Sequence, residues 1–408
     1  MPDDRGARVL MLLDKRFPPD PRVERELLAL SNAGYAPELV HEAPASGFSE
    51  SDWNGIRTHG FPAARTRHER WWRYAGAIST GRNLAWDRWL EQRLADRGFE
   101  VVHCHDLPIM LTGIRLARRL GAKVVFDRHE NWPGMLEGLG RAAPPGLKTH
   151  VLWKTVNNPD LWLRWERRAI LGSDLVISVS PEADAEMPER PRRAAVVSNY
   201  VGLGSLPPPT EWPLAASPLR LCFLGTLNDM FSLAECVEAI ALLPRGAVEL
   251  VLVGDGDTRS RLVALSRARG LEARVRVTGW LPRPEALSLV AKAHACLLPL
   301  RDNALTRTTI GNKVFEYMGL ERAVLCSGVG VMARIVSEAG AGLVIDPWNA
   351  GSVAEILRTL LGNPGPLLEM GRRGRLAVLE RYNWEAEQSR LVDAYAALLS
   401  DASAGRAG

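Results

Sequence analysis

The sequence predicts an α/β protein of two domains, each built around a doubly wound parallel sheet. Short apolar runs alternate with helical patterns along most of the 408 residues, as expected for parallel strands joined by helices. A Pro-rich stretch at residues 202–218 interrupts this alternation near the middle of the chain. The hydrophobic content of 46% suffices for a buried core on each side of that stretch.

The strands are predicted from apolar runs that are too short for helices. These runs are Val9–Leu13, Val101–His103, Lys123–Phe126, Leu175–Val179, Leu221–Leu224, Val248–Val253, Val275–Thr278 and Ala295–Leu298. Helical patterns fall between them, for example at Val23–Asn32, Ser232–Leu243 and Ser260–Arg269. The predicted first domain covers residues 1–201, the linker 202–218 and the second domain 219–380. Ligands are expected in a cleft faced by the two domains, at the loops that follow the strands.

Composition excludes several classes of protein. The net charge of +4 is mild for this length and gives no reason to expect a nucleic-acid binder. The five cysteines form no pair with zinc-ligand spacing and are expected to be reduced, as in a cytoplasmic protein. No apolar run approaches the ~20 residues that cross a membrane. The sequence carries no signal for an oligomeric state.

Two helical regions, residues 65–98 and 147–169, are rich in both Trp and Arg. Interleaved Trp and Arg are typical of a helix at an anionic membrane surface, here its cytoplasmic face, or of a hydrophobic acceptor groove. The alternative is that these tryptophans pack long helices onto the first domain. Trp71 and Trp72 are the residues with which the membrane hypothesis is most directly tested.

The stretch Thr308–Met318 places a lysine and a glutamate inside a segment otherwise suited to burial. A helix beginning near Gly311 places the polar side chains on one side and the apolar ones on the other. The polar side comprises Asn312, Lys313, Glu316 and Tyr317, and the apolar side Val314, Phe315 and Met318. The polar side is therefore expected to face a ligand.

Several segments, taken in order, resemble family 4 glycosyltransferases, which are retaining enzymes with the GT-B fold of two Rossmann-like domains. The resemblance covers nearly the whole chain. It is carried by Arg8–Glu26, Val101–Asp106, Phe126–Pro133, Trp165–Ser180, Val251–Gly256, Gly279–Pro282 and, most specifically, Asn312–Met318. Glu380–Glu385 and the following helix, within residues 381–408, resemble the family's terminal segment, which returns to the first domain.

The resemblance implies a nucleotide-sugar donor site in the second domain. A helix N-terminus and Lys313 suit a departing diphosphate, and Glu316 is expected to bind ribose hydroxyls, as the matching family glutamate does. The other residues assigned to the donor are Gly225, Thr226, Asn228, Gly254, Leu281, Arg307 and Asn312.

In the first domain the resemblance implies the catalytic and acceptor side. His129 is expected to contact the donor sugar or diphosphate, and Glu130 to orient or deprotonate an acceptor hydroxyl. His105 and Asp106 have acceptor-side or structural roles, Arg22 meets a ligand or caps a helix, and Trp132 lies in the acceptor-side loop. No metal and no other cofactor is expected, because GT-B enzymes generally need none.

The sequence also departs from the family pattern. Thr226 and Met230 stand roughly where an Arg and a Lys are usual, and Thr308 stands where the first glutamate of a pair is expected. The expected function is retaining transfer of a sugar from a nucleotide to a hydroxyl acceptor by a front-face mechanism. The alternatives are a catalytically silent nucleotide-sugar-binding homologue and a GT-B-fold sugar-nucleotide epimerase.

Overall fold

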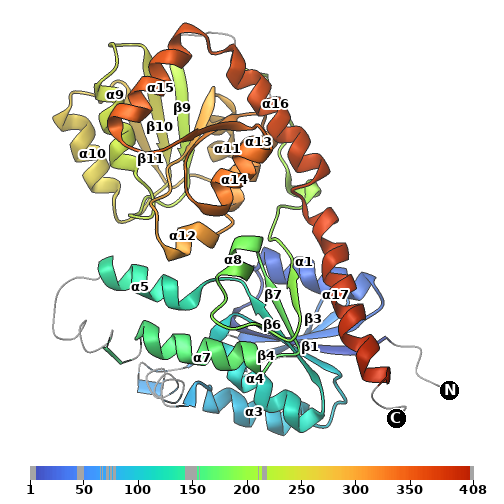
Figure 1. Ribbon diagram of the computed structural model, residues 1–408. Helices are drawn as coiled ribbons and strands as arrows, with labels where there is room; N and C mark the ends of the chain where they lie inside the picture. The colour runs from blue at the N-terminus through green and yellow to red at the C-terminus, as the bar shows by residue number, and fades with distance from the viewer. Residues whose placement is uncertain are drawn as a thin grey trace. The chain divides into compact units, whose positions relative to one another are not determined.

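The computed structural model describes residues 6–43, 50–64, 66, 68–69, 73, 76, 80–142, 154–155, 157–209, 211–213 and 218–404. The chain divides into two compact units. Unit 1 comprises Met1–Asn199 and Glu387–Gly408, and unit 2 comprises Tyr200–Ala386. Figure 1 shows that each unit has its own twisted sheet with helices packed against it.

The sheet of unit 1 has the strand order β3-β4-β2-β1-β5-β6-β7-β8. Its strands are β1 (Arg8–Arg16), β2 (Ala36–Ala43), β3 (Glu50–Trp53), β4 (Ile56–Pro62), β5 (Val101–His105), β6 (Lys123–Arg128), β7 (Leu175–Ser178) and β8 (Ala194–Val196). All neighbouring pairs are parallel except β3 with β4, which form a hairpin at the edge of an otherwise parallel sheet.

The helices of unit 1 cover both faces of this sheet (Figure 1). They are α1 (Pro21–Asn32), α3 (Leu84–Leu94), α4 (Leu107–Leu120), α5 (Trp132–Ala142), α7 (Pro159–Leu171), α8 (Pro181–Ala185) and most of α17 (Trp384–Ala404). Successive side chains of β5 point to opposite faces. Val102 and Cys104 enter the apolar core with α3, α4 and α7, whereas His103 meets α1 and α17.

The sheet of unit 2 is entirely parallel, in the order β11-β10-β9-β12-β13-β14. Its strands are β9 (Leu219–Leu224), β10 (Val248–Val253), β11 (Val275–Gly279), β12 (Ala295–Leu298), β13 (Ala323–Ser327) and β14 (Gly342–Ile345). Its helices are α9 (Leu233–Ala241), α10 (Arg259–Ala268), α11 (Arg283–Ala291), α12 (Ala304–Thr308), α13 (Asn312–Gly319), α14 (Gly330–Glu338), α15 (Ala350–Gly362) and α16 (Gly365–Glu380), with a 3-10 turn at Leu203–Ser205.

Both sheets reverse their strand order at one point. In unit 1 the reversal lies between β1 and β5, and in unit 2 between β9 and β12. In open parallel sheets, ligands bind beyond the carboxyl ends of the strands at such a switch point. The loops after these four strands are therefore where each unit is expected to bind a ligand.

The tryptophans of the Trp- and Arg-rich regions pack inward where the structure describes them. Trp86 is 3% exposed, Trp162 6% and Trp165 9%, and all three belong to the core of unit 1. Trp71 and Trp72 lie outside the described residues. Among the described helices, none combines the length and the apolar character needed to cross a bilayer.

Candidate functional site

Two glycine turns meet at the carboxyl ends of β9 and β10 in unit 2. Gly225 has φ 145° and Gly254 has φ 144°, a region that disfavours residues with a side chain. A Cβ added to Gly254 would lie 1.9 Å from the carbonyl oxygen of Gly225. Only glycine allows the two turns to come this close. Their backbone N–H groups are already used, since Gly225 donates to the Val253 carbonyl and Gly254 to the Gly279 carbonyl.

The side chain of Lys313 reaches this turn from the start of α13. Its Nζ lies 3.9 Å from the ring centroid of Phe231 and 4.7 Å from that of Phe223. A Cβ on Gly225 would lie 2.6 Å from the same nitrogen. Burial lowers the pKa of Lys313 to about 8, while Glu316 opposes that shift. The ammonium group is thus held by two aromatic rings beside the Gly225 turn.

Glu316 lies one helical turn after Lys313. Its Oε1 pairs with the Arg283 guanidinium at 2.9 Å. Burial raises the pKa of Glu316, and Arg283 and Lys313 counteract that rise. The carboxylate is therefore largely buried but keeps one partner that is itself more than half exposed.

The interpretation of Tyr317 as part of the polar side of α13 is wrong. Tyr317 is fully buried, and its hydroxyl accepts a hydrogen bond from the backbone N–H of Leu224 at 2.8 Å. A tyrosine combines a large apolar ring with one polar atom, so a helical wheel does not decide its orientation. The hydroxyl secures the end of β9 immediately before Gly225.

The other residues assigned to the donor are less closely grouped. Thr226 and Asn312 are exposed, and Leu281 is half-buried. Asn228 accepts a hydrogen bond from the backbone N–H of Met230, which shapes the turn. Arg307 forms a two-point ion pair with Asp302 at 2.6 and 2.9 Å. The structure therefore brings together Gly225, Gly254 and Lys313, with Glu316 one turn away.

Thr308, which replaces the expected first glutamate, is 3% exposed. Its hydroxyl lies 3.4 Å from the Ala304 carbonyl oxygen and 3.3 Å from that of Leu305. The hydroxyl is used within α12, so this position offers no carboxylate to a sugar.

A charged network lies at the switch point of unit 1. Asp106 follows β5 with φ 66° and ψ 161°, a strained conformation for a residue with a side chain. Its Oδ2 lies 3.0 Å from Lys15 Nζ and 3.5 Å from Arg22 NH2. Burial opposes ionisation of Asp106, but Arg22 and Lys15 outweigh it and hold the pKa well below its usual range.

Arg22 links this network to the next strand. Its NH1 lies 3.5 Å from Asp127 Oδ2, at the end of β6. Arg22 is 7% exposed, and its guanidinium faces two buried carboxylates at once. Asp14, near the end of β1, is less well compensated, because burial and Asp106 raise its pKa to about 6 although Lys15 acts in the opposite direction.

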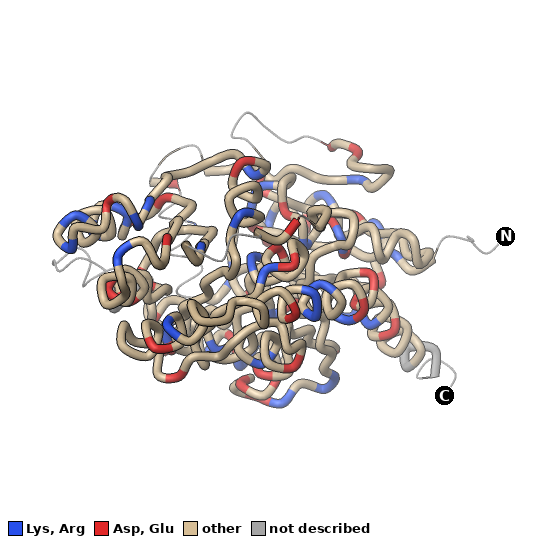
Figure 2. Tube along the Cα trace, turned by 90° about the horizontal axis from the view of Figure 1, so that it is seen from above, with Lys and Arg blue, Asp and Glu red and all other residues tan. Residues whose placement is uncertain are grey.

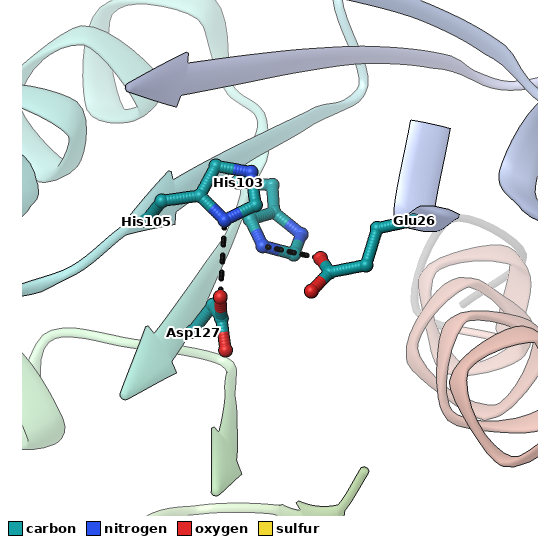
Figure 3. A group of neighbouring side chains, drawn as sticks. All are labelled: Glu26, His103, His105 and Asp127. Atoms are coloured by element: carbon teal, nitrogen blue, oxygen red, sulfur yellow. Dashed lines mark hydrogen bonds and ion pairs between the residues drawn. The ribbon is translucent and has the colours of Figure 1, made fainter. Parts of the chain in front are cut away.

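Figure 3 shows a buried group beneath this network, formed by Glu26, His103, His105 and Asp127. Their potential metal-ligand atoms all lie within 4.8 Å of one another. His105 Nδ1 is 3.0 Å from Asp127 Oδ2, and His103 Nε2 is 3.5 Å from Glu26 Oε2.

Hydrogen bonds satisfy part of this group, but His103 Nε2, His105 Nε2 and Glu26 Oε2 are buried and have no hydrogen-bond partner among the described residues. His103 Nδ1 lies 2.6 Å from the hydroxyl of Tyr395 on α17. Burial keeps both histidines neutral at ordinary pH, lowering the pKa of His105 to about 3. Burial also raises the pKa of Glu26 well above its usual value, with Asp127 adding to the effect. His103 Nε2 faces the Glu26 carboxyl at 3.5 Å without a hydrogen bond, and Arg22 lies 3.5 Å from Asp127.

His129, Glu130 and Trp132 follow β6. Burial lowers the pKa of His129 to about 3, and Arg22 reinforces the shift. Its Nε2 is enclosed and has no hydrogen-bond partner among the described residues. Glu130 is exposed, and Trp132 packs at a tilt on Trp162 with ring centroids 5.8 Å apart. Arg22, Asp106 and His105 share one network, whereas Trp132 belongs to the contact between α5 and α7.

Sequence reasoning missed four residues that shape these sites: Lys15, Phe231, Arg283 and Tyr395. Lys15 lies two residues after the predicted strand Val9–Leu13, a position that was a usable signal. Phe231, Arg283 and Tyr395 act from other elements, and no local pattern connects them to Lys313, Glu316 and His103.

Solved structures of low sequence identity share the whole fold. Sucrose-phosphate synthase from Thermosynechococcus elongatus superposes with a TM-score of 0.74 at 18% identity, covering 97% of this chain and 100% of that one. Anabaena HepE in complex with UDP superposes with a TM-score of 0.67 at 13% identity, covering 96% and 100%. The chain therefore has the GT-B glycosyltransferase fold, as predicted, with α17 returning to unit 1.

Sequence comparison places both units among glycosyltransferase domains. Residues 22–203 match the description Glycosyltransferase Family 4, and residues 218–363 match Glycosyl transferases group 1. Glycogen synthase from Mycobacterium tuberculosis (strain CDC 1551 / Oshkosh) is 22% identical over 73% of this chain and 69% of its own length. α-D-Kanosaminyltransferase from Streptomyces kanamyceticus is 26% identical over 42% of this chain and 44% of its own. The chain is a glycosyltransferase similar to family 4.

Proposed function

We propose that this enzyme transfers a sugar, with retention, from a nucleotide-sugar donor to a hydroxyl acceptor. The observation that carries the proposal is Lys313, whose ammonium group is held over two phenylalanine rings beside the Gly225 turn, at the switch point of unit 2. A fixed cation at this end of the sheet suits the charge that develops on a departing diphosphate. The complexes of HepE with UDP and UDP-glucose support this class of donor.

The proposed reaction is front-face. The bond between the anomeric carbon and the diphosphate oxygen breaks while the bond from that carbon to the acceptor oxygen forms on the same face. The acceptor oxygen is itself the nucleophile, so no protein nucleophile is required, and its proton passes to the departing diphosphate. Lys313 stabilises the leaving group, and replaces the Arg and Lys that are absent at Thr226 and Met230.

Glu316 holds the donor ribose in this proposal. Its carboxylate is already desolvated and keeps the exposed Arg283 as its partner. A ribose diol can replace or join the arginine without a further large cost of burial. Trp280, 75% exposed directly after β11, provides a flat surface on which a nucleobase can stack.

Unit 1 supplies the residues for the acceptor side. His129 is neutral near pH 7, because its pKa is about 3, so it acts as a hydrogen-bonding group rather than as an acid. Glu130 is exposed and suited to orienting the acceptor hydroxyl by accepting a hydrogen bond from it. We also propose a cytoplasmic enzyme that contacts an anionic membrane surface.

The first test is a thermal-shift screen against UDP-, GDP-, ADP- and dTDP-sugars. A donor that binds the native state raises the melting temperature by mass action. We expect one nucleotide class to do so in the wild type and in the control Glu272→Ala, which removes an exposed carboxylate, but not in Glu316→Ala. A full shift in Glu316→Ala would refute the ribose assignment.

Two other functions give different outcomes. A silent homologue binds the donor but shows neither hydrolysis nor transfer with any acceptor. A sugar-nucleotide epimerase converts the donor without an acceptor. The absence of Arg and Lys at Thr226 and Met230 favours the silent homologue, which is therefore the main rival.

We further propose that neither donor binding nor transfer needs a metal ion. The test is dialysis of the enzyme against EDTA, followed by assay with and without added Mg²⁺, Mn²⁺ or Zn²⁺. We expect rates and melting temperatures to stay the same within error. A loss of activity or stability that one ion restores would contradict the proposal. If His103→Gln prevents that recovery, the ion is located in the group of Figure 3.

A further inference from the structure

A cavity of about 690 Å³ lies between α3, α4 and α7 in unit 1. Its lining includes five arginines and a single carboxylate, Glu91. The arginines are Arg82, Arg115, Arg118, Arg119 and Arg168. Over the whole chain 51 basic residues are nearly balanced by 47 acidic ones, and Figure 2 shows both kinds along much of the trace. The surplus of positive charge at this cavity is therefore local and is not a consequence of the net charge of the chain.

Internal ion pairs account for only part of these arginines. Arg115 and Arg119 share Glu91, at 2.9 and 3.7 Å, and Arg82 lies 3.5 Å from Asp87. Arg168 stacks over the Trp165 ring, 4.9 Å from its centroid. In the part of the chain that the structure describes, neither Arg118 nor Arg168 forms an ion pair. Two guanidinium groups are thus available to an anionic ligand.

Part of the cavity lining is apolar. Leu111, Ile114 and Leu171 line it, and Leu171 is 56% exposed at the end of α7. A small hydrophilic anion would make no favourable contact with these apolar side chains. A phosphate joined to an acyl chain matches both the basic and the apolar parts of the lining. The arginines and the exposed leucine are parts of one continuous lining, as a membrane surface would require.

We propose that this arginine-lined cavity binds the phosphate headgroups of anionic phospholipids and docks the enzyme on a membrane. The assignment rests on α3, α4 and α7 alone and does not involve the donor residues of unit 2. Trp86, Trp162 and Trp165 are buried, so the contact is electrostatic with shallow apolar support rather than insertion of tryptophans. Its strength is expected to fall with salt, since exposed charges are screened over about 10 Å at 0.1 M.

The test is co-sedimentation of the full chain with vesicles of 70% phosphatidylcholine and 30% phosphatidylglycerol. The variant combines Arg118→Gln, Arg119→Gln and Arg168→Gln, and the control combines Arg267→Gln, Arg276→Gln and Arg372→Gln on exposed positions of unit 2. Each arginine near an anionic surface is worth roughly a factor of five. We expect the vesicle partition coefficient to fall by about a hundredfold in the variant and to change little in the control.

Three outcomes would overturn the proposal. One is equal binding by the variant and the control, and another is equal binding of the wild type to pure phosphatidylcholine vesicles. The third is a thermal shift with millimolar inorganic phosphate, lost in the variant, without vesicle binding, which would identify a site for free phosphate. Melting curves verify that the variant folds, and donor thermal shifts that persist in it separate this test from that of the proposed function.

Discussion

Lys313→Met is expected to reduce sugar transfer by about 10²–10³-fold, the usual effect of removing one group that stabilises developing negative charge. Methionine keeps a stem that can pack on Phe223 and Phe231 but carries no charge. The measurement is the transfer rate at saturating donor, with Lys292→Met, an exposed lysine of unit 2, as the control. Activity within a fewfold of wild type would exclude Lys313 as the diphosphate cation.

The same substitution is expected to stabilise the fold. A native pKa of about 8 against an ordinary value of 10.5 means that the charged lysine costs roughly 3 kcal/mol of unfolding free energy at neutral pH. The unfolded chain binds this proton more tightly than the native one between pH 8 and 10.5. Because of Lys313, the unfolding free energy of the wild type therefore rises with pH across that window. The extra stability of Lys313→Met is fully present below pH 8 and shrinks above it. A constant difference across the window would show that the lysine is not desolvated.

Arg22→Gln is expected to lower the unfolding free energy by about 3–5 kcal/mol, because it removes a buried cation from between two carboxylates. Asp106 Oδ2 and Asp127 Oδ2 each lie 3.5 Å from the guanidinium in the wild type. Denaturant unfolding measures the loss, with Arg16→Gln, an exposed neighbour, as the control.

The pH dependence of this loss identifies its cause. In the wild type the pKa of Asp106 is held below its usual range, so ionised Asp106 adds stability above its unfolded pKa, and that stability is lost as pH falls through the folded pKa. In the variant that pKa rises. The destabilisation is therefore largest near pH 7 and decreases as the pH falls, because Asp106 takes up a proton at a higher pH in the variant than in the wild type. A loss that does not vary with pH would indicate disrupted packing instead.

The sequence predicted strands and candidate site residues best where polar side chains come directly after a buried apolar run. The runs Val248–Val253 and Ala295–Leu298 coincide with β10 and β12, because such short apolar segments have few other ways to be buried. The motif that ends at Met318 located α13 within one residue, as Gly311 precedes its first turn. The hairpin of β3 and β4 was missed, although Asn54-Gly55 between the two strands is a strong turn signal.

Contacts between residues far apart in the chain could not be predicted from the sequence, for a physical reason. Tyr395 and His103 are 292 residues apart, and Lys15 and Asp106 are 91 apart, so nothing in the local pattern of either residue indicates the other. Periodicity reports which face of an element is buried and not which element covers it. The pairing of Glu316 with Arg283 is similar, because it depends on how α11 and α13 meet the same sheet.

The return of α17 to unit 1 bears on how the protein is made. Residues 387–404 carry Tyr395 into the polar interior of unit 1, where Glu387 also accepts a hydrogen bond from the backbone N–H of Ser198. At a synthesis rate of roughly 5–20 residues per second, these partners of β5 and β8 are made many seconds after the strands themselves. The N-terminal domain cannot complete its folding first, as domains usually do during translation. A nascent chain arrested before residue 387 should therefore display an unfinished, protease-sensitive first domain.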